Sequence, residues 1–225
     1  EEIISTSCLG DSLVKSQAKA TVRMLVAGAF CTAWLVKAAN NTQGAMMLTT
    51  GHCGTQSRAT FQFYYAGDCG DAVDSGGKAD IRKKSCDGTL RSSETEKDEQ
   101  AIYELDLSCR VVDDVTPIIL DIGKPEVGEG MYMIGHPNAR PQFLSHQEPH
   151  DDGEHCEVRR LLTWWGTSKR VSYYCDTQGG NSGSPVFSAR TGMAFAIHSH
   201  GGCNNNEWSS NYGGLLGNSG IINAF

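Results

Sequence analysis

The stretch Gln178-Gly179-Gly180-Asn181-Ser182-Gly183-Ser184-Pro185 sets Ser182 in a glycine-dense turn, directly before the apolar pair Val186-Phe187. Glycine adopts backbone angles that other residues resist, so the N–H groups of such a turn can converge on one point beside the serine. A hydrolase that attacks through serine needs donors there, because negative charge develops on the attacked carbonyl oxygen. We therefore expect Ser182 to be a nucleophile, with the N–H groups of Gly180 and Ser182 as its oxyanion hole.

A second candidate is His52, which follows the apolar segment 45–50 and precedes Cys53. An imidazole at a strand end can take the proton of a serine hydroxyl. With acidic residues between His52 and Ser182, the chain order is histidine, acid, serine. That is the order of chymotrypsin-like enzymes, whereas α/β-hydrolases and subtilisins use other orders. The hydrolase pattern Gly-x-Ser-x-Gly also fails, because Ser184 replaces its last glycine.

The overall composition excludes several classes of function. A chain of 225 residues suits one large all-β domain or two small ones. The net charge of −7 and the lack of a dense Lys/Arg stripe argue against a nucleic-acid surface. No apolar run approaches the ~20 residues of a membrane span. Nine cysteines at irregular spacings indicate an oxidising compartment, so we expect a secreted, extracellular or periplasmic protein with several disulfides.

Short β-rich segments separated by turn residues predict an all-β sandwich or barrel. We expect mostly loop at 66–97 and 150–155, and a short helix only around 218–225. The expected strands are residues 21–26, 30–36, 45–50, 60–65, 101–107, 110–120, 131–135, 160–165, 170–174 and 185–198.

Several motifs carry a resemblance to a known family. Leu48-Thr49-Thr50-Gly51-His52-Cys53 resembles the Thr-Ala-x-His-Cys of trypsin-like proteases, and residues 180–185 look like their Gly-Asp-Ser-Gly-Gly-Pro. Residues 133–137 and 197–202 are similar to the bacterial glutamyl and lysyl endopeptidase branch. The resemblance implies one serine-protease domain of two six-stranded antiparallel β-barrels, at about 1–112 and 113–225. It places the active site in the cleft between them.

The resemblance also implies a role for each matching residue. Ser182 would attack the peptide bond and form an acyl-enzyme, while His52 acts as general base and then protonates the leaving amine. Ser199 matches the backbone segment that pairs with the substrate. The acid stays open between two neighbours. Glu99 aligns without a gap, although its longer side chain needs a backbone retreat of about 1.5 Å, and Asp98 fits if one residue bulges.

Disulfide connectivity does not follow from sequence alone. Two bridges are implied by the resemblance, one bracing the histidine loop and one tying the N-terminus to the second barrel. Two more pairs can close a hairpin and staple the long polar loop. We expect Cys31–Cys53, Cys8–Cys203, Cys156–Cys175 and Cys69–Cys86, with Cys109 unpaired.

Asp176 lies six residues before Ser182, where trypsin has the aspartate at the bottom of its specificity pocket. A carboxylate there would pair with a substrate Arg or Lys through charge-assisted hydrogen bonds, and Gly201 would leave the pocket entrance open. We therefore expect cleavage after Arg or Lys. The alternative is glutamyl specificity, because His198 and Thr177 match residues that glutamyl endopeptidases use to hold a Glu side chain.

The competing function is a non-catalytic binding protein on the same fold, because a fold does not fix an activity. The spacing of His198, His200 and Cys203 matches no structural zinc site. We therefore expect no metal and no cofactor, a protein or peptide substrate, no nucleic-acid or membrane partner, and a monomer.

Overall fold

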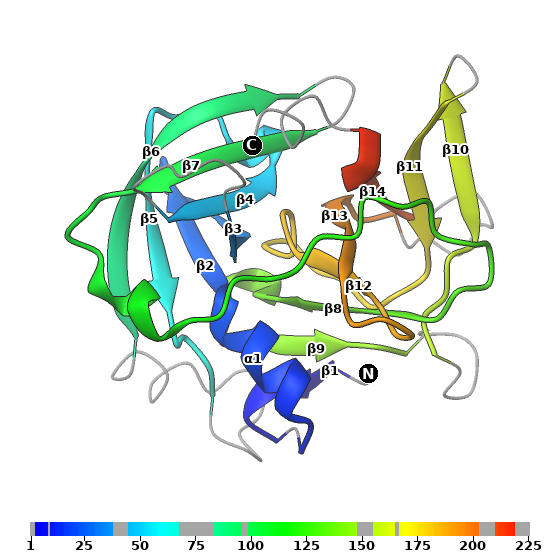
Figure 1. Ribbon diagram of the computed structural model, residues 1–225, viewed down its shortest axis with the longest axis horizontal. Coiled ribbons are helices and arrows are strands. Elements are labelled where there is room, and N and C mark those ends of the chain that lie inside the picture. The colour runs from blue at the N-terminus through cyan, green and yellow to red at the C-terminus, as the bar shows by residue number, and fades with distance from the viewer. Residues whose placement is uncertain are drawn as a thin grey trace.

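The computed structural model describes residues 3–8, 10–37, 45–67, 83–95, 99–147, 155–164, 167–202 and 210–218. Figure 1 shows a β-barrel beside a second, larger β-sheet, with most of the helical turns at their margins. This all-β arrangement confirms the fold class that the motifs predict. No helix among the described residues is long and apolar enough to cross a membrane.

The first unit is a closed barrel with the strand order β2-β3-β4-β7-β6-β5. Apolar side chains fill its interior, including the fully buried Phe61 and Tyr103, whose rings lie edge to face. Closure satisfies the backbone groups of every strand edge, so the barrel is a rigid support for the loops at its rim. The strands are β2 (Thr21–Val26), β3 (Ala29–Val36), β4 (Met46–Thr50), β5 (Arg58–Phe63), β6 (Lys84–Glu94) and β7 (Gln100–Leu105).

The second unit is an antiparallel sheet with the strand order β1-β9-β8-β12-β13-β14-β11-β10. It has eight strands among the described residues and is not closed by a regular ladder, whereas the resemblance implies a second six-stranded barrel. Isolated bridges at Gly130–Glu157 and Gln147–His155 add to it. The strands are β1 (Ile3–Ser5), β8 (Met131–Gly135), β9 (Phe143–Ser145), β10 (Arg160–Trp164), β11 (Thr167–Tyr173), β12 (Pro185–Ser188), β13 (Ala194–His200) and β14 (Asn211–Leu215).

Direct hydrogen bonds join the two units at β3. The N–H of Thr32 donates to the carbonyl of Ser182 (2.8 Å), and the indole N–H of Trp34 donates to the carbonyl of Gly183 (3.1 Å). The connecting segment also pairs with both units, through the bridges Val36–Ile118 and Leu120–Ala194. The loop that carries Ser182 is therefore anchored on the barrel although it leads into β12 of the sheet.

One helix was not expected from the sequence. Helix α1 (Ser12–Ala20) begins after Asp11, whose carboxylate accepts from the N–H groups of Leu13 and Val14. Such an N-cap stabilises a helix by about 1 kcal/mol. Only Gln17 and Ala20 of the helix are buried, which explains the weak apolar period. The short 3-10 turns are η1 (Thr6–Cys8), η2 (Gly51–Cys53), η3 (Arg110–Asp114), η4 (Pro137–Ala139) and η5 (Leu216–Asn218).

The structure corrects the sequence prediction at several elements. Residues 110–120 form η3 and isolated bridges instead of a strand, and 185–198 contain two strands joined by a turn. The expected loop 66–97 contains β6, which pairs with both β5 and β7 along the barrel. Most side chains of β6 are exposed, so its polar sequence carries no apolar alternation. Residues 68–82, 150–154 and 219–225 lie outside the described part of the chain.

Three disulfides join described cysteines. Cys31–Cys53 and Cys156–Cys175 are pairs that the sequence analysis expects. The expected Cys69–Cys86 pair and the unpaired Cys109 are wrong, because Cys86 is bonded to Cys109. The pairing of β6 with β7 explains this bond, since it brings the start of one strand beside the end of the other. The Cα atoms of Cys86 and Cys109 are 5.4 Å apart. Cys8 is also disulfide-bonded, and Cys203 lies outside the described residues.

Candidate active site

His52 lies in η2, the tight turn that follows β4 at the rim of the barrel. The Cys31–Cys53 disulfide ties this turn to β3. Gly51 has no room for a side chain, because a Cβ there would collide with the carbonyl of Glu94. The turn therefore packs closely against the end of β6. The side chain of His52 is 41% exposed, so its ring can meet a substrate.

Glu99 directly precedes β7 and is 7% exposed. Its backbone is in the left-handed region, with φ of 47°. Two contacts hold this conformation, because Thr50 Oγ1 donates to the Glu99 carbonyl (3.0 Å) and the Glu99 N–H donates to a carboxylate oxygen of Glu94 (3.3 Å). Glu99 Oε2 lies 3.6 Å from His52 Nδ1. Of the two acid candidates, Asp98 lies outside the described residues.

The Glu99 carboxylate is surrounded by three basic groups. Its Oε1 lies 3.4 Å from an Nη atom of Arg170, and its Oε2 lies 3.4 Å from His200 Nδ1. Burial acts to raise the pKa of Glu99, but His52, His200 and Arg170 together outweigh it, and the pKa falls below its usual value. Glu99 is therefore ionised at neutral pH and presents a negative charge to the imidazole of His52.

The Ser182 loop is held by backbone hydrogen bonds to both units. The N–H of Gly183 donates to the carbonyl of His198 (2.7 Å), and the N–H of Ser184 donates to the carbonyl of Asn181 (2.9 Å). Gly183 has φ of 92°, and a Cβ there would collide with Thr32. Glycine is thus required at this position, both for its backbone angle and for the close approach to β3.

The N–H groups of Gly180 and Ser182 are the donors expected for the oxyanion hole. The carbonyl of Gly179 accepts from the N–H of Asn138, and the carbonyl of Gly180 accepts from Thr32 Oγ1 (2.9 Å). Since the C=O and N–H of a trans peptide point in opposite directions, the N–H of Gly180 is directed away from Asn138. Neither this N–H nor that of Ser182 donates to another group of the described residues.

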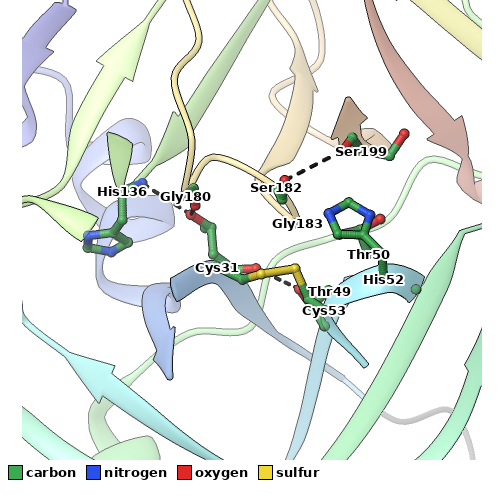
Figure 2. Close-up of a disulfide and its surroundings, with 12 residues drawn as sticks. Cys31, Thr49, Thr50, His52, Cys53, His136, Gly180, Ser182, Gly183 and Ser199 are labelled. Carbon is green, nitrogen blue, oxygen red and sulfur yellow. Dashed lines mark hydrogen bonds between the residues drawn. A yellow bond between two sulfur atoms is a disulfide. The ribbon is translucent and has the colours of Figure 1, made fainter. Parts of the chain in front are cut away.

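The hydroxyl of Ser182 points to the backbone of β13. Its Oγ lies 3.5 Å from the carbonyl of Ser199, and the next residue, His200, has its ring centroid 5.3 Å from that of His52. Figure 2 shows Ser182, His52 and Ser199 grouped beside the Cys31–Cys53 disulfide. Within the described part of the chain no hydrogen bond joins Ser182 to His52, so a catalytic bond between them requires the serine side chain to rotate.

The expected specificity residues fall into two groups. Asp176 is half-buried and lines a small pocket of about 10 Å³ with Phe143 and Asn181. Its carboxylate has no cationic partner among the described side chains. Thr177 Oγ1 instead donates to Asn211 Oδ1 (3.0 Å).

The second group is Gly201 and His198. Gly201 is near both Thr177 and Asn211. His198 is buried and its Nδ1 lies 2.7 Å from the hydroxyl of Tyr173. Burial, followed by the nearby His200 and His52, lowers the pKa of His198 to about 3, so this imidazole is neutral.

Sequence reasoning missed three contributors to the site. Arg170 and His200 both contact Glu99, and Thr32 supports the loop through Gly180 and through the N–H of His136 (3.1 Å). Arg170 and His200 reach Glu99 from strands distant in sequence, so no local pattern marks them. The segment 197–202 did single out His200, but as part of a motif and not as a neighbour of the acid.

Comparisons with known proteins agree on the fold. A glutamyl endopeptidase solved in complex with MPD is 15% identical, has a TM-score of 0.62, and covers 96% of this chain and 92% of its own. The Rv3671c protease from M. tuberculosis in its active form is 13% identical, has a TM-score of 0.63, and covers 95% of this chain and 83% of its own. Identities this low show the fold alone.

Sequence comparisons give the family. The secreted RxLR effector protein 73 of Plasmopara viticola is 29% identical over 203 residues. The match covers 85% of this chain and 47% of that protein, so the chain spans about half the length of this relative. The family model described as lysyl endopeptidase, C-terminal domain, matches residues 4–212. That match takes in nearly the whole chain, and the chain therefore belongs to the lysyl endopeptidase C-terminal domain family.

Proposed function

We propose that this protein is a serine endopeptidase that hydrolyses peptide bonds through an acyl-enzyme. The observation that carries the proposal is the approach of Glu99 Oε2 to His52 Nδ1, 3.6 Å, at the rim where the Ser182 loop is anchored. An ionised carboxylate beside Nδ1 favours the tautomer with its proton on that nitrogen, which leaves the lone pair of Nε2 free to accept the serine proton.

The proposed reaction uses Ser182, His52, Glu99 and two N–H groups of the serine loop. Ser182 Oγ rotates from the carbonyl of Ser199 toward His52 and attacks the substrate carbonyl, while Nε2 takes its proton. The oxyanion that forms accepts hydrogen bonds from the N–H groups of Gly180 and Ser182. The imidazolium is stabilised by Glu99 and protonates the leaving amine. Water then repeats the sequence on the acyl-enzyme and regenerates the serine.

We propose cleavage after Arg or Lys. The supporting observation is the half-buried carboxylate of Asp176, which has no cationic partner among the described residues. A substrate guanidinium or ammonium would supply that partner. The name of the matching family, lysyl endopeptidase, agrees with a cationic residue at this position. Asp176 is the carboxylate on which the proposal depends.

A second specificity is favoured by another observation. The hydroxyl of Thr177 and the amide of Asn211 lie near Gly201, and strand β13 carries the buried, neutral ring of His198. A threonine hydroxyl and an imidazole N–H can donate to a substrate carboxylate once the Thr177 hydroxyl turns from Asn211, so cleavage after Glu is the alternative.

A cleavage profile on a mixed peptide library tests both specificities. We expect the wild-type protein to cut after Arg and Lys and the isosteric D176N variant to lose that preference. The T177V variant, which loses the hydroxyl but keeps the shape, serves as the matched control and should keep it. If the wild type instead cuts after Glu and T177V loses that cleavage, glutamyl specificity would replace the proposal based on Asp176. S182A provides the blank, because cuts that persist in it come from a contaminant.

We propose that the protein acts outside the cell or in the periplasm, on a protein or peptide substrate and as a monomer. Disulfides are stable in oxidising compartments, and the relative from Plasmopara viticola is named as secreted.

A further inference from the structure

Three potential metal ligands converge beside the proposed base. His52 from η2, Glu99 before β7 and His200 at the end of β13 each present one ligand atom, and these atoms lie within 4.8 Å of one another. Glu99 Oε2 is central, at 3.6 Å from His52 Nδ1 and 3.4 Å from His200 Nδ1. The two rings are tilted by 48° with their centroids 5.3 Å apart. We name these residues the His52–Glu99–His200 cluster.

An unsatisfied atom at the centre of the cluster points to a ligand. Glu99 Oε2 is buried and forms no hydrogen bond within the described part of the chain, because neither imidazole nitrogen, at 3.6 and 3.4 Å, meets it with hydrogen-bond geometry. A buried carboxylate oxygen normally has a partner, because leaving it without one costs about 1–3 kcal/mol or more. The other oxygen, Oε1, has a partner in Arg170 at 3.4 Å. The unsatisfied carboxylate oxygen is therefore the one that faces the two histidines.

We propose that the His52–Glu99–His200 cluster binds Zn²⁺, and that the bound ion switches off the serine protease. Two imidazoles and one carboxylate are a donor set that holds zinc in proteins and leaves a fourth position for water. In a tetrahedral site, ligand atoms about 2.0–2.1 Å from zinc are about 3.3 Å apart. The two measured separations from Glu99 Oε2 are already close to this value.

The remaining adjustment is small and falls on movable side chains. The two histidine nitrogens must approach from at most 4.8 Å, and both side chains are about half-exposed, at 41% and 52%. Arg170 opposes the ion through its charge, but it contacts the opposite carboxylate oxygen. Its presence and the open fourth position argue for a reversible site rather than a closed structural one.

The mechanism of inhibition follows from imidazole chemistry and rests on the proposed function. Zinc takes the Nδ1 lone pair of His52, and the proton that Nδ1 carried in the free enzyme moves to Nε2. The ring stays neutral, but Nε2 now bears hydrogen and cannot accept the Ser182 proton. Zinc also takes the carboxylate oxygen that would stabilise the imidazolium. One ion therefore removes both the base and its partner without touching the nucleophile.

Binding is measured apart from activity so that the two proposals can fail separately. Zn²⁺ is titrated by calorimetry into metal-free wild type, S182A, H200N and H155N, and Co²⁺ absorption reports the coordination geometry in S182A. H155N is the matched control, because His155 is an exposed histidine whose ring lies beside His146 and away from the cluster. Hydrolysis of a peptide is then measured with and without Zn²⁺, each variant being compared with its own rate in chelator.

We expect one zinc per chain in wild type, S182A and H155N, with equal affinity and a tetrahedral Co²⁺ spectrum. H200N should bind at least about 100-fold more weakly, since even outer-shell changes at metal sites cost 10–100-fold, and its hydrolysis should resist zinc. Binding that persists in H200N, or zinc that binds without inhibiting, would overturn the proposal. If the wild type binds zinc as expected but hydrolyses no peptide, the metal site is supported and the proposed protease activity is refuted.

Discussion

Glu99 Oε2 faces His52 Nδ1 at 3.6 Å from a backbone held in the left-handed region, with φ of 47°. Such a conformation costs a non-glycine residue about 1–3 kcal/mol. Thr50 and Glu94 stabilise it through hydrogen bonds to the Glu99 carbonyl and N–H. The strained turn therefore sets how far the glutamate side chain extends toward the imidazole.

Removing the charge of Glu99 tests its role as the acid. We expect E99Q to lower kcat by about 10³–10⁴-fold, because an amide no longer favours the active tautomer of His52. E99D withdraws the carboxylate by about one bond length and should cost about 100-fold. Steady-state kinetics on a peptide substrate measures both effects.

The matched control for Glu99 is its neighbour. D98N removes a carboxylate one residue earlier and should retain kcat within a few-fold of the wild type. A large loss in D98N together with an active E99Q would assign the acid to Asp98 instead.

Thr32 is expected to support the oxyanion hole from the barrel. Its fully buried hydroxyl donates to Gly180 and accepts from the N–H of His136. T32V leaves both partners unsatisfied, so we expect a loss of about 1–3 kcal/mol in unfolding free energy and a kcat lower by about 10–100-fold. T32S keeps the hydroxyl and should retain most of the activity. Urea unfolding and kinetics of the two variants make the comparison, and equal kcat values would refute this role.

The Cys86–Cys109 bond makes a prediction about stability. It closes a loop with a sequence separation of 23, for which the chain-entropy model gives about 3 kcal/mol. The double variant C86S/C109S should lose stability by that order in chemical unfolding. Peptide mapping without reduction should recover the 86–109 pair, whereas alkylation of Cys109 in the unreduced, unfolded protein would contradict it.

Two buried histidines predict sensitivity to acid. Burial lowers the pKa of His136 to about 3 although its bond to the Arg140 carbonyl opposes the shift, and burial likewise lowers the pKa of His198 to about 3. An unfolded histidine takes up a proton near pH 6.5. The unfolded state therefore binds more protons than the folded state between about pH 6.5 and about pH 3. As the pH is lowered across that window, the free energy of unfolding decreases by about 1 kcal/mol per pH unit for each histidine.

The pH dependence can be assigned with one variant. H136N keeps a donor near the position of Nδ1 and removes the titrating ring. Urea unfolding at a series of pH values should show a shallower loss of stability in H136N than in the wild type. Identical slopes would mean that His136 does not stay neutral in the folded protein.

The sequence predicts the candidate chemical groups of the site better than the contacts between them. Ser182 and His52 stand in short motifs, and a neighbour of each has a structural reason: a Gly183 side chain would collide with Thr32, and Cys53 is bonded to Cys31. The choice between Asp98 and Glu99 depends on one left-handed residue. No propensity marks a glutamate for that conformation, so the alternatives stayed open.

The misplaced elements have a common physical cause. Most side chains of strand β6 are exposed, so its polar residues lack the alternation that identifies a half-buried strand. Because the sequence does not predict β6, it also does not predict the pairing of β6 with β7, which places Cys86 beside Cys109. Contacts such as Arg170 with Glu99 likewise arise from the packing of the two units and have no local signal.

Covalent labelling of Ser182 tests the central claim most directly. A fluorophosphonate reacts with a serine only where a base activates it and an oxyanion hole stabilises the product. The account predicts one adduct on the peptide that contains Ser182 in the wild type, slower labelling in E99Q and none in S182A. A folded wild type that takes up no label, or that is labelled at another serine, would contradict it.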